Sequence, residues 1–228
     1  MMEAALRMVG AGDGVLTEII ALSLRVSLAA VALAALVGVP LGAALALLPV
    51  PGRRLWVVLL NASMGLPPVV VGLVVYLLLS RSGALGSWGL LFTPSAMVMA
   101  QWILVTPIVA ALSRQVIEEM WEEYREPLQS LGVGRWRAVR TLIWEARFSL
   151  VTALLAGFGR AAAEVGAVLI VGGNIARHTR VMTTAIALET SKGDLPLALA
   201  LGIVLIALTL AVNLAGYLVG EYARFRWG

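Results

Sequence analysis

The stretch EEMWEEYREPLQSLGVGRWRAVRTLIWEAR (residues 118–147) is the one long polar segment between strongly apolar blocks. Charged side chains are costly inside a bilayer, so this stretch is too charged to lie in lipid. Its charged and apolar residues also recur at helical spacings, which is not typical of a slack linker. We therefore interpret it as an ordered segment outside the membrane, and we interpret the apolar blocks on either side from this starting point.

The composition predicts an all-α polytopic membrane protein. Hydrophobic residues make up 61% of the 228 residues and charged residues 13%. A soluble domain usually has about 45–50% apolar and about 25% charged residues. The apolar runs are long enough for helices to cross a ~30 Å hydrocarbon layer, whereas a barrel would have alternating segments of ~10 residues. The absence of cysteine excludes disulfides, thiolate zinc sites and iron–sulfur clusters.

The apolar blocks predict five spans within a single transmembrane domain that covers residues 1–228. Residues 1–14 are expected to form a short tail or interfacial turn, and Thr179–Thr190 a short helix outside the membrane. The expected spans are about residues 16–48, 55–79, 94–113, 148–171 and 195–219, with the polar connection at 114–147.

The distribution of Lys and Arg predicts the orientation of the chain. With five spans, the turn after the first span, the polar connection and the C-terminal tail share one side. That side carries ten Lys or Arg residues and the other side five, namely Arg7, Arg81, Arg177, Arg180 and Lys192. The more positive side is expected to be cytoplasmic. The chain is thus predicted to lie in the plasma membrane of a bacterium or archaeon, with the N-terminus outside and the C-terminus in the cytoplasm.

Prolines and small polar residues interrupt the second span. Pro67 and Pro68 remove two backbone donors, so the helix must break there. Such a break is tolerated in a membrane only where protein or a water-filled cavity covers it. Asn61 and Ser63 precede the break. This segment is either a candidate wall of a translocation pathway or a kink whose carbonyls are satisfied by water.

Two other features leave alternatives open. Gly38 and Gly42 have the G-x-x-x-G spacing that permits close helix packing, but Pro40 between them equally favours a simple bend. The outer loop after the fourth block contains Arg177 and His178. These residues, with Arg180, are either ordinary solvated loop charge, or a surface that docks a binding protein or attracts anions.

The residues needed for several kinds of chemistry are missing. No G-x-x-x-x-G-K-[ST] sequence is present to cradle ATP phosphates, and Lys192 is the only lysine. His178 is the only histidine, so no H-E-x-x-H zinc site can form. The chain is therefore expected to be no enzyme and to hold no metal or cofactor.

The polar stretch itself has an internal order. Glu residues dominate up to Glu126, and Pro127 fits the start of a new helix. Gly132 and Gly134 allow either a tight turn or a close backbone approach. An amphipathic helix with a basic face is expected to follow. Its apolar residues are Trp136, Val139, Leu142 and Ile143, interleaved with Arg135, Arg137 and Arg140. From this pattern alone, a helix that lies on anionic headgroups is an equal alternative.

The segment EPLQSLG (residues 126–132) and its continuation resemble the "EAA" loop of ATP-binding-cassette importer permeases. Glu126, Gly132 and Ile143 match the loop's Glu, its Gly six residues later and its late Ile, whereas Pro127 and Leu128 replace two alanines. The resemblance implies that the cytoplasmic ATPase contacts this loop. The implied coupling residues are Glu126, Leu128, Leu131, Gly132, Gly134, Trp136, Arg137 and Ile143.

Flanking segments are similar to the oxyanion branch of these permeases. NASMGLPP (61–68), GFGRAAAEVG (157–166) and GGNI (172–175) look most like tungstate permeases, with molybdate permeases close behind. Over residues 15–220 the resemblance implies a type I importer fold. It also implies a dimer, two cytoplasmic ATP-binding subunits and an extracytoplasmic binding protein, with lipid around the spans and no nucleic acid. Molybdate or sulfate remains an alternative substrate; a membrane scaffold or enzyme with a surface helix is the alternative of another class.

An ionisable pair lies within the fourth predicted span. Arg160 and Glu164 are four residues apart and thus on one helix face. Such residues in a membrane usually face a pathway or a partner. They either satisfy each other and fix packing, or line a pathway where Arg160 attracts an oxyanion and Glu164 tempers that attraction. The pathway candidates are Asn61, Ser63, Pro67, Pro68, Arg160, Glu164 and Asn174.

Overall fold

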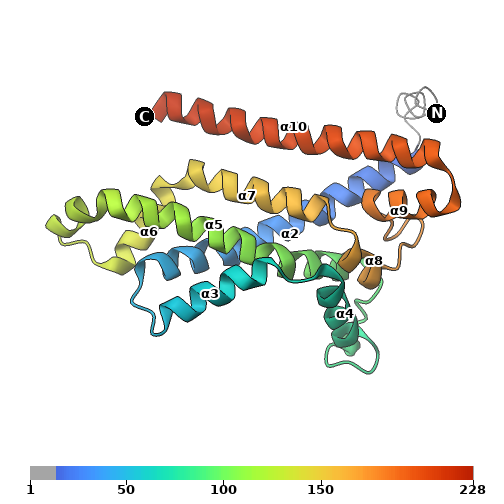
Figure 1. Cartoon of the computed structure of the whole chain (residues 1–228), viewed down its shortest axis with the longest axis horizontal. Helices are drawn as coiled ribbons and strands as arrows, with labels where there is room; N and C mark the ends of the chain where they lie inside the picture. The colour runs from blue at the N-terminus through green and yellow to red at the C-terminus, as the bar shows by residue number, and fades with distance from the viewer. Residues whose placement is uncertain (1–13, 228) are drawn as a thin grey trace. The chain divides into compact units, whose positions relative to one another are not determined.

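The computed structural model describes residues 14–227, and every regular element among them is helical. Figure 1 shows the order of the elements along the chain. The α-helices are α2 (Gly14–Leu47), α3 (Arg53–Met64), α4 (Pro68–Leu79), α5 (Pro94–Ser130), α6 (Arg135–Glu145), α7 (Arg147–Ala162), α8 (Gly166–Gly172), α9 (Met182–Lys192) and α10 (Leu195–Trp227), and η1 (Gly86–Trp88) is a short 3₁₀ helix.

The helix lengths agree with a multi-span protein. Helices α2, α5 and α10 are each long and apolar enough to cross a membrane. The bent pairs α3–α4 and α6–α7 raise the number of candidate spans in the described chain from three to five if each pair is one span. The prediction of an all-α polytopic fold is therefore confirmed.

Contacts within the chain divide it into two compact units, which are described separately. The first unit comprises the described residues up to 30, together with 67–103 and 159–212. The second unit comprises residues 31–66, 104–158 and the chain from 213 onward. Helices α2, α5, α7 and α10 contribute residues to both units.

In the second unit, the later part of α2 packs closely against α5. A Cβ atom at Gly38 would lie 3.1 Å from the Thr106 carbonyl oxygen. A Cβ atom at Gly42 would lie 2.9 Å from the Arg114 nitrogen. Helix α2 continues through Pro40 to Leu47. Of the two alternatives for this G-x-x-x-G segment, close packing is thus the one that the structure supports.

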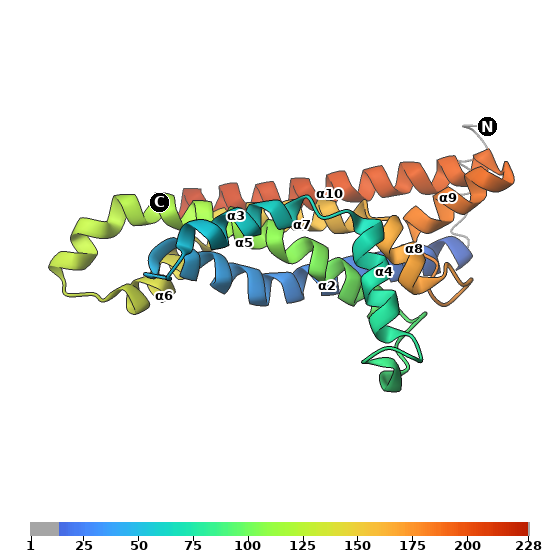
Figure 2. The same cartoon turned by 60° about the horizontal axis from the view of Figure 1, so that its bottom comes forward.

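In the first unit, α4 packs against α8, as both cartoon views show (Figure 1 and Figure 2). A Cβ atom at Gly72 would lie 2.7 Å from the Cα of Ala167, so the two backbones meet without an intervening side chain. The start of α2 packs against α9, where the Ser23 hydroxyl accepts the Met182 N–H at 2.8 Å. Leu16, Met182 and Leu201 are buried in the apolar cluster around that contact.

Three sequence predictions need correction. Pro127 does not start a helix but lies inside the last turn of α5, where it costs one intrahelical bond three residues before the end. The fourth predicted span is not one helix, because residues 163–165 break it into α7 and α8. The short outer helix begins at Met182 rather than Thr179, since the Thr179 hydroxyl is engaged by the preceding loop. The tail predicted over residues 1–14 lies outside the described residues except for Gly14.

Candidate functional site

The turn between α5 and α6 is a Schellman motif. The Val133 N–H donates to the Leu128 carbonyl at 2.9 Å, and the Gly132 N–H donates to the Gln129 carbonyl at 3.0 Å. Gly132 has a φ of +70°, the left-handed conformation that the motif needs and that glycine adopts without steric cost. Val133 and Leu128 both pack against the core of the second unit, as the motif's apolar contact requires. The predicted tight turn is therefore present, and Gly132 is the residue on which it depends.

Helix α6 is amphipathic and buries a face of small and branched residues. Ala138 and Leu142 are fully buried against Ile117 of α5 and the end of α2. Val139 and Ile143 flank this face and pack against the same cluster. Ile143 is half-buried and helps to hold α6 in place, and its predicted contact with the ATPase stays a prediction.

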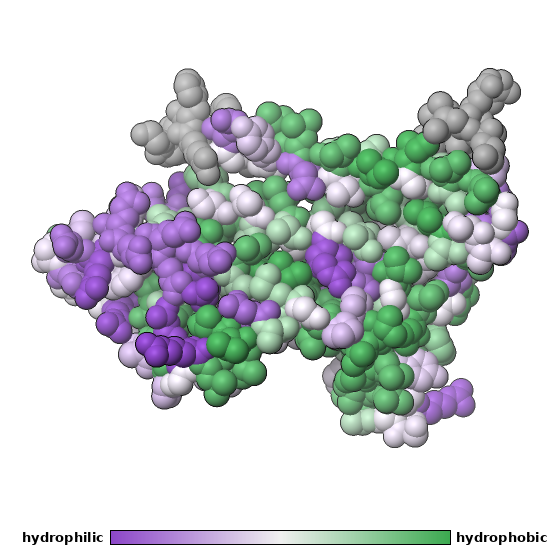
Figure 3. Space-filling model, viewed as in Figure 1, coloured by the Kyte–Doolittle hydropathy of each residue, from purple (hydrophilic) through white to green (hydrophobic). Residues whose placement is uncertain are grey.

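The exposed side of the turn and of α6 combines charge with large apolar side chains. Leu131 and Trp136 are 78% and 76% exposed, so Trp136, unlike Leu142, is not buried against the rest of the chain. Hydrophilic residues cover this end of α5 and α6 (Figure 3). Large exposed apolar residues in a polar rim are typical of a protein–protein contact. We call this region the coupling surface; its exposed members are Glu126, Leu131, Gly132, Gly134, Trp136 and Arg137, with Leu128 half-buried behind them.

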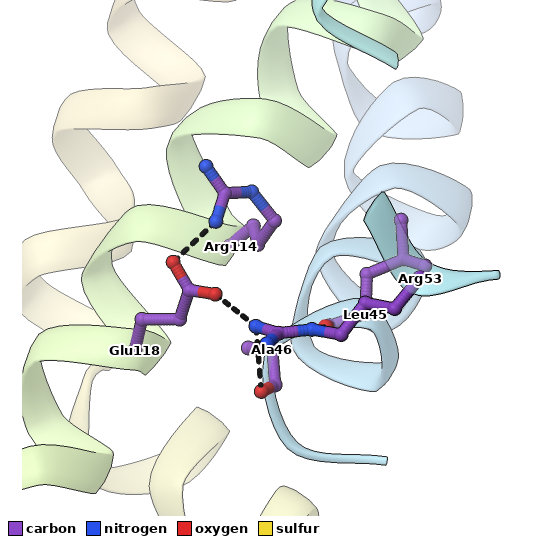
Figure 4. A network of polar contacts seen from close by, with 5 residues as sticks. All are labelled: Leu45, Ala46, Arg53, Arg114 and Glu118. Carbon is purple, nitrogen blue, oxygen red and sulfur yellow. Dashed lines mark hydrogen bonds and ion pairs between the residues drawn. The ribbon is translucent and has the colours of Figure 1, made fainter. Parts of the chain in front are cut away.

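A charged network joins the end of α2 to α5 within the same unit (Figure 4). The Glu118 carboxylate accepts hydrogen bonds from Arg53 through Oε1 and from Arg114 through Oε2. Arg53 also donates to the carbonyls of Leu45 and Ala46, at 2.6 and 3.2 Å. These carbonyls belong to the last turn of α2, which has no intrahelical donors for them. Arg53 therefore caps α2 and ties its end to the helix that leads to the coupling surface.

We expect Arg53→Ala to loosen the end of α2. Losing the two carbonyl bonds and a half-exposed ion pair costs about 1–2 kcal/mol. Amide hydrogen exchange in the last turn of α2 should accelerate by a factor of roughly 5–30. The matched control is Arg54→Ala, because Arg54 is exposed and has no ion pair among the described residues. Equal exchange in the two variants would contradict the capping role.

A buried ion pair lies at the break between α7 and α8. The Arg160 guanidinium donates to Glu164 Oε2 at 2.6 Å, and the Ala167 N–H donates to Glu164 Oε1 at 3.0 Å. Glu164 is 3% exposed and Arg160 31%. Glu164 is not on a helix, contrary to the sequence prediction, but the pair that was predicted forms. The carboxylate satisfies both a cation and a free N–H at the start of α8, as a buried charge requires.

Polar side chains from other elements bond to carbonyls of the break, and one more hydrogen bond orders the loop after α8. Gln101 of α5 donates through Nε2 to the Ala161 carbonyl at 3.0 Å. The Thr183 hydroxyl of α9 donates to the Glu164 carbonyl at 2.8 Å. Asn174 donates through Nδ2 to the Thr184 carbonyl at 3.3 Å. An interrupted helix in an apolar chain is tolerated when neighbouring elements supply such partners. The tertiary structure therefore stabilises this break.

The pathway residues predicted around the second span lie at a real helix break. Pro67 precedes α4 in extended conformation and Pro68 is its first residue, so the predicted interruption is confirmed. The Ser63 hydroxyl donates to the Leu59 carbonyl at 2.7 Å, and Asn61 is exposed. The predicted residues divide between the units: Asn61 and Ser63 belong to the second, whereas Pro67, Pro68, Arg160, Glu164 and Asn174 belong to the first.

Sequence reasoning missed several polar residues in both regions. The sequence around Gln101 and Thr183 shows only that each is a polar residue in an apolar segment, which does not predict their contacts. Arg114 and Glu118 have the i,i+4 spacing of a helical ion pair and could have been predicted. The partner of Glu118 from the α2–α3 turn, Arg53, is 65 residues away in the sequence, and no local pattern indicates that contact.

These features, together with helices that can cross a membrane, define a multi-span membrane protein with an exposed polar connection. The chain belongs to the family described as "Binding-protein-dependent transport system inner membrane component", whose profile matches residues 38–226. It is therefore a multi-pass permease of the inner membrane that works with an ATPase and a binding protein, and the ATPase is a separate subunit.

Three relatives are similar over most of their length. A Haloferax volcanii protein named "Probable anion ABC transporter permease protein" is 44% identical, over 92% of this chain and 90% of its own. The "Tungstate uptake system permease protein TupB" of Peptoclostridium acidaminophilum is 41% identical, over 96% of both chains. The TupB protein of Campylobacter jejuni is 42% identical, over 71% of this chain and 67% of its own. The relatives are transport permeases, and so is this chain, which is not an enzyme.

Proposed function

We propose that this permease carries a tetrahedral oxyanion, most specifically tungstate, into the cell. The observation that carries the proposal is the 41% identity, over 96% of both chains, to a permease named for tungstate uptake. The segments at 61–68, 157–166 and 172–175 favour the same substrate. The substrate would arrive on an extracytoplasmic binding protein, and a cytoplasmic ATPase would drive transport.

The coupling surface is the proposed contact with the ATPase. Leu131 and Trp136 offer two large apolar anchors, and Arg137 offers a charge beside them. Aromatic and arginine side chains are enriched among the residues that carry most of the binding energy at interfaces. The Schellman turn fixes the position of these anchors relative to α5. Movement of the ATPase would therefore be passed to α5 rather than absorbed by a flexible loop.

The buried pair at the α7–α8 break is the proposed polar element of the pathway. An arginine that is one-third exposed can attract an oxyanion, while the neighbouring Glu164 limits how tightly the anion is held. Conduction needs such weak, transient binding. Pro67, Pro68 and Asn174, which belong to the same unit as the pair, would line the same pathway. Two copies of the chain, related by two-fold symmetry, would enclose it in the lipid bilayer.

Reconstitution tests the substrate directly. The permease, its ATPase and its cognate binding protein are placed in proteoliposomes, and ATP-dependent uptake of tungstate, molybdate and sulfate is compared. We expect tungstate to be taken up with the highest ratio of kcat to KM. Preference for molybdate or sulfate would reassign the substrate within the oxyanion class. A complete lack of ATP-dependent anion uptake, with the three components assembled, would overturn the proposal.

The proposed orientation places the N-terminus outside and the coupling surface in the cytoplasm. The chain has no cysteine, so a single introduced thiol can be labelled at one site. A membrane-impermeant thiol reagent should label Ala176→Cys in intact cells, because Ala176 is exposed in the predicted outer loop. Ser130→Cys should react only after the cells are permeabilised. The reverse pattern would invert the topology.

A further inference from the structure

The loop from residue 173 to 181 is held rigidly by its own hydrogen bonds. The Thr179 hydroxyl donates to the Gly172 carbonyl at 2.5 Å and accepts the Ile175 N–H at 3.0 Å. The Ile175 carbonyl in turn accepts three backbone N–H groups, including that of Arg180 at 3.1 Å. Arg177 has a φ of +59°, a conformation that costs a non-glycine residue energy. A compact, ordered loop thus presents a fixed set of side chains.

This loop and the first turns of α2 line a half-open pocket of about 400 Å³ within the first unit. At ~30 Å³ per water molecule, it has room for roughly a dozen waters, and so for a small hydrated ion. Arg25 and Glu18 line it from α2. Arg177, His178 and Arg180 line it from the loop. With a neutral histidine, the charged side chains of the lining sum to two positive charges.

The arginines of this pocket are available to a ligand. Arg25 and Arg177 are exposed, and neither has an ion pair among residues 14–227. Arg180 donates weakly to the Asn174 carbonyl at 3.4 Å, and its buried Nε atom has no hydrogen-bond partner in the described chain. A buried donor without a partner costs about 1–3 kcal/mol. Three other arginines, Arg53, Arg114 and Arg160, each pair with a carboxylate and are in that respect different.

We propose that this pocket is a binding site for a soluble tetrahedral oxyanion, where the anion rests on the outer side before it enters the pathway. The proposal rests on the function and orientation proposed above. Guanidinium groups match the geometry of an oxyanion through paired N–H donors. Three arginines line this one concave site, so it has both positive charge and hydrogen-bond donors. Glu18 lowers the net attraction, so that an anion can also leave.

The charged residues line a concave, half-open site rather than a flat surface, which favours a small anion over ordinary solvated loop charge. A binding protein or an anionic lipid headgroup could still use the same arginines from outside. The test distinguishes these two occupants, because with either of them a soluble anion would not change the rate of thiol modification.

The test uses the full-length permease with a single thiol in the pocket wall. Ala176→Cys introduces that thiol, since Ala176 lines the pocket and is exposed. The protein is placed in nanodiscs, either of zwitterionic phosphatidylcholine or with anionic phosphatidylglycerol added. The rate of modification by a thiol reagent is measured with tungstate, molybdate, sulfate or chloride at equal ionic strength. Ala84→Cys, exposed in another loop of the same unit, is the control thiol.

We expect the three oxyanions, but not chloride, to slow modification of Ala176→Cys and to leave Ala84→Cys unaffected. Adding Arg25→Gln and Arg177→Gln should weaken the protection by roughly tenfold or more for each arginine removed. Arg81→Gln is the matched charge control, because Arg81 is exposed and does not line the pocket. Arg25→Lys with Arg177→Lys keeps both charges and should retain part of the protection, which guards against a simple folding defect.

Three outcomes would overturn the site: no protection by any oxyanion, protection equal to that by chloride, or protection by phosphatidylglycerol or the binding protein alone. Protection that persists in the Arg25→Gln, Arg177→Gln protein would also contradict the proposed site. Labelling requires neither ATP nor uptake. Specific protection in a permease that does not import tungstate would refute the proposed function but support the anion site. Import of tungstate without any protection would support the proposed function but refute the anion site.

Discussion

Gly132→Glu is expected to abolish coupled transport while the permease remains in the membrane. The substitution forces a left-handed φ of +70° on a residue with a Cβ atom, which costs about 1–2 kcal/mol. No atom lies within 4 Å of the place of that Cβ, so the new carboxylate would project from the coupling surface. A charge buried there against the ATPase without a partner would cost at least ~3 kcal/mol, or about a hundredfold in affinity.

Co-purification of the ATPase and ATP-dependent uptake in proteoliposomes measure this effect. Gly132→Asn is the matched control, because asparagine tolerates the left-handed conformation and adds no charge. Gly134→Ala is a second control, since Gly134 has a φ of −68° and open space around it. We expect both controls to retain most of the uptake. Normal uptake by Gly132→Glu would instead contradict the proposal that the coupling surface contacts the ATPase.

Glu164→Gln is expected to reduce oxyanion uptake by at least about tenfold, or to uncouple ATP hydrolysis from uptake. The amide oxygen can still accept the Ala167 N–H, so the start of α8 keeps its cap. The charge of Arg160 loses its counter-ion. Removing one partner of a fully buried pair costs about 3–5 kcal/mol, and less here because Arg160 is 31% exposed. An uncompensated cation would hold an oxyanion too tightly for rapid release.

Comparing single and double variants separates a pathway role from a packing role. Uptake, ATPase activity and thermal stability are measured for Glu164→Gln, Arg160→Gln and the double variant. If the pair only fixes packing, the double variant should regain both stability and uptake, because no unpaired charge remains. If the pair serves the pathway, the double variant should be stable but should transport poorly. Full uptake with normal coupling in Glu164→Gln would exclude the pathway role.

The local features of the coupling segment could be predicted from sequence. Gly132 predicts a left-handed turn because few other residues adopt that conformation, and the 3-to-4 spacing of Leu142 and Val139 predicts the buried face of α6. The position of Trp136 could not be predicted, because an amphipathic pattern does not say how wide the buried face is. The place of Pro127 inside α5 could not be predicted, because a proline removes one intrahelical bond and is usually found at a first turn.

The pathway region was less predictable, for a physical reason. The break after α7 exists because Gln101 and Thr183 supply partners to carbonyls that would otherwise be orphaned. Both residues come from elements distant in the sequence. Composition favours an unbroken apolar helix. The interruption is stable because tertiary hydrogen bonds satisfy backbone groups that the helix leaves without partners. The Arg160–Glu164 spacing still indicated the pair, since four residues bring the two side chains together on either side of a helix end.

The Schellman turn has a consequence for engineering. Its two defining hydrogen bonds join backbone groups of residues 128–133, and Leu128 and Val133 anchor it against the core. A segment closed by its own backbone is modular. Exchanging residues 126–137 with those of another permease, while keeping these two apolar positions, should transplant partner choice without rebuilding the scaffold. Chimeric importers that recruit a foreign ATPase could be made by replacing this short cassette alone.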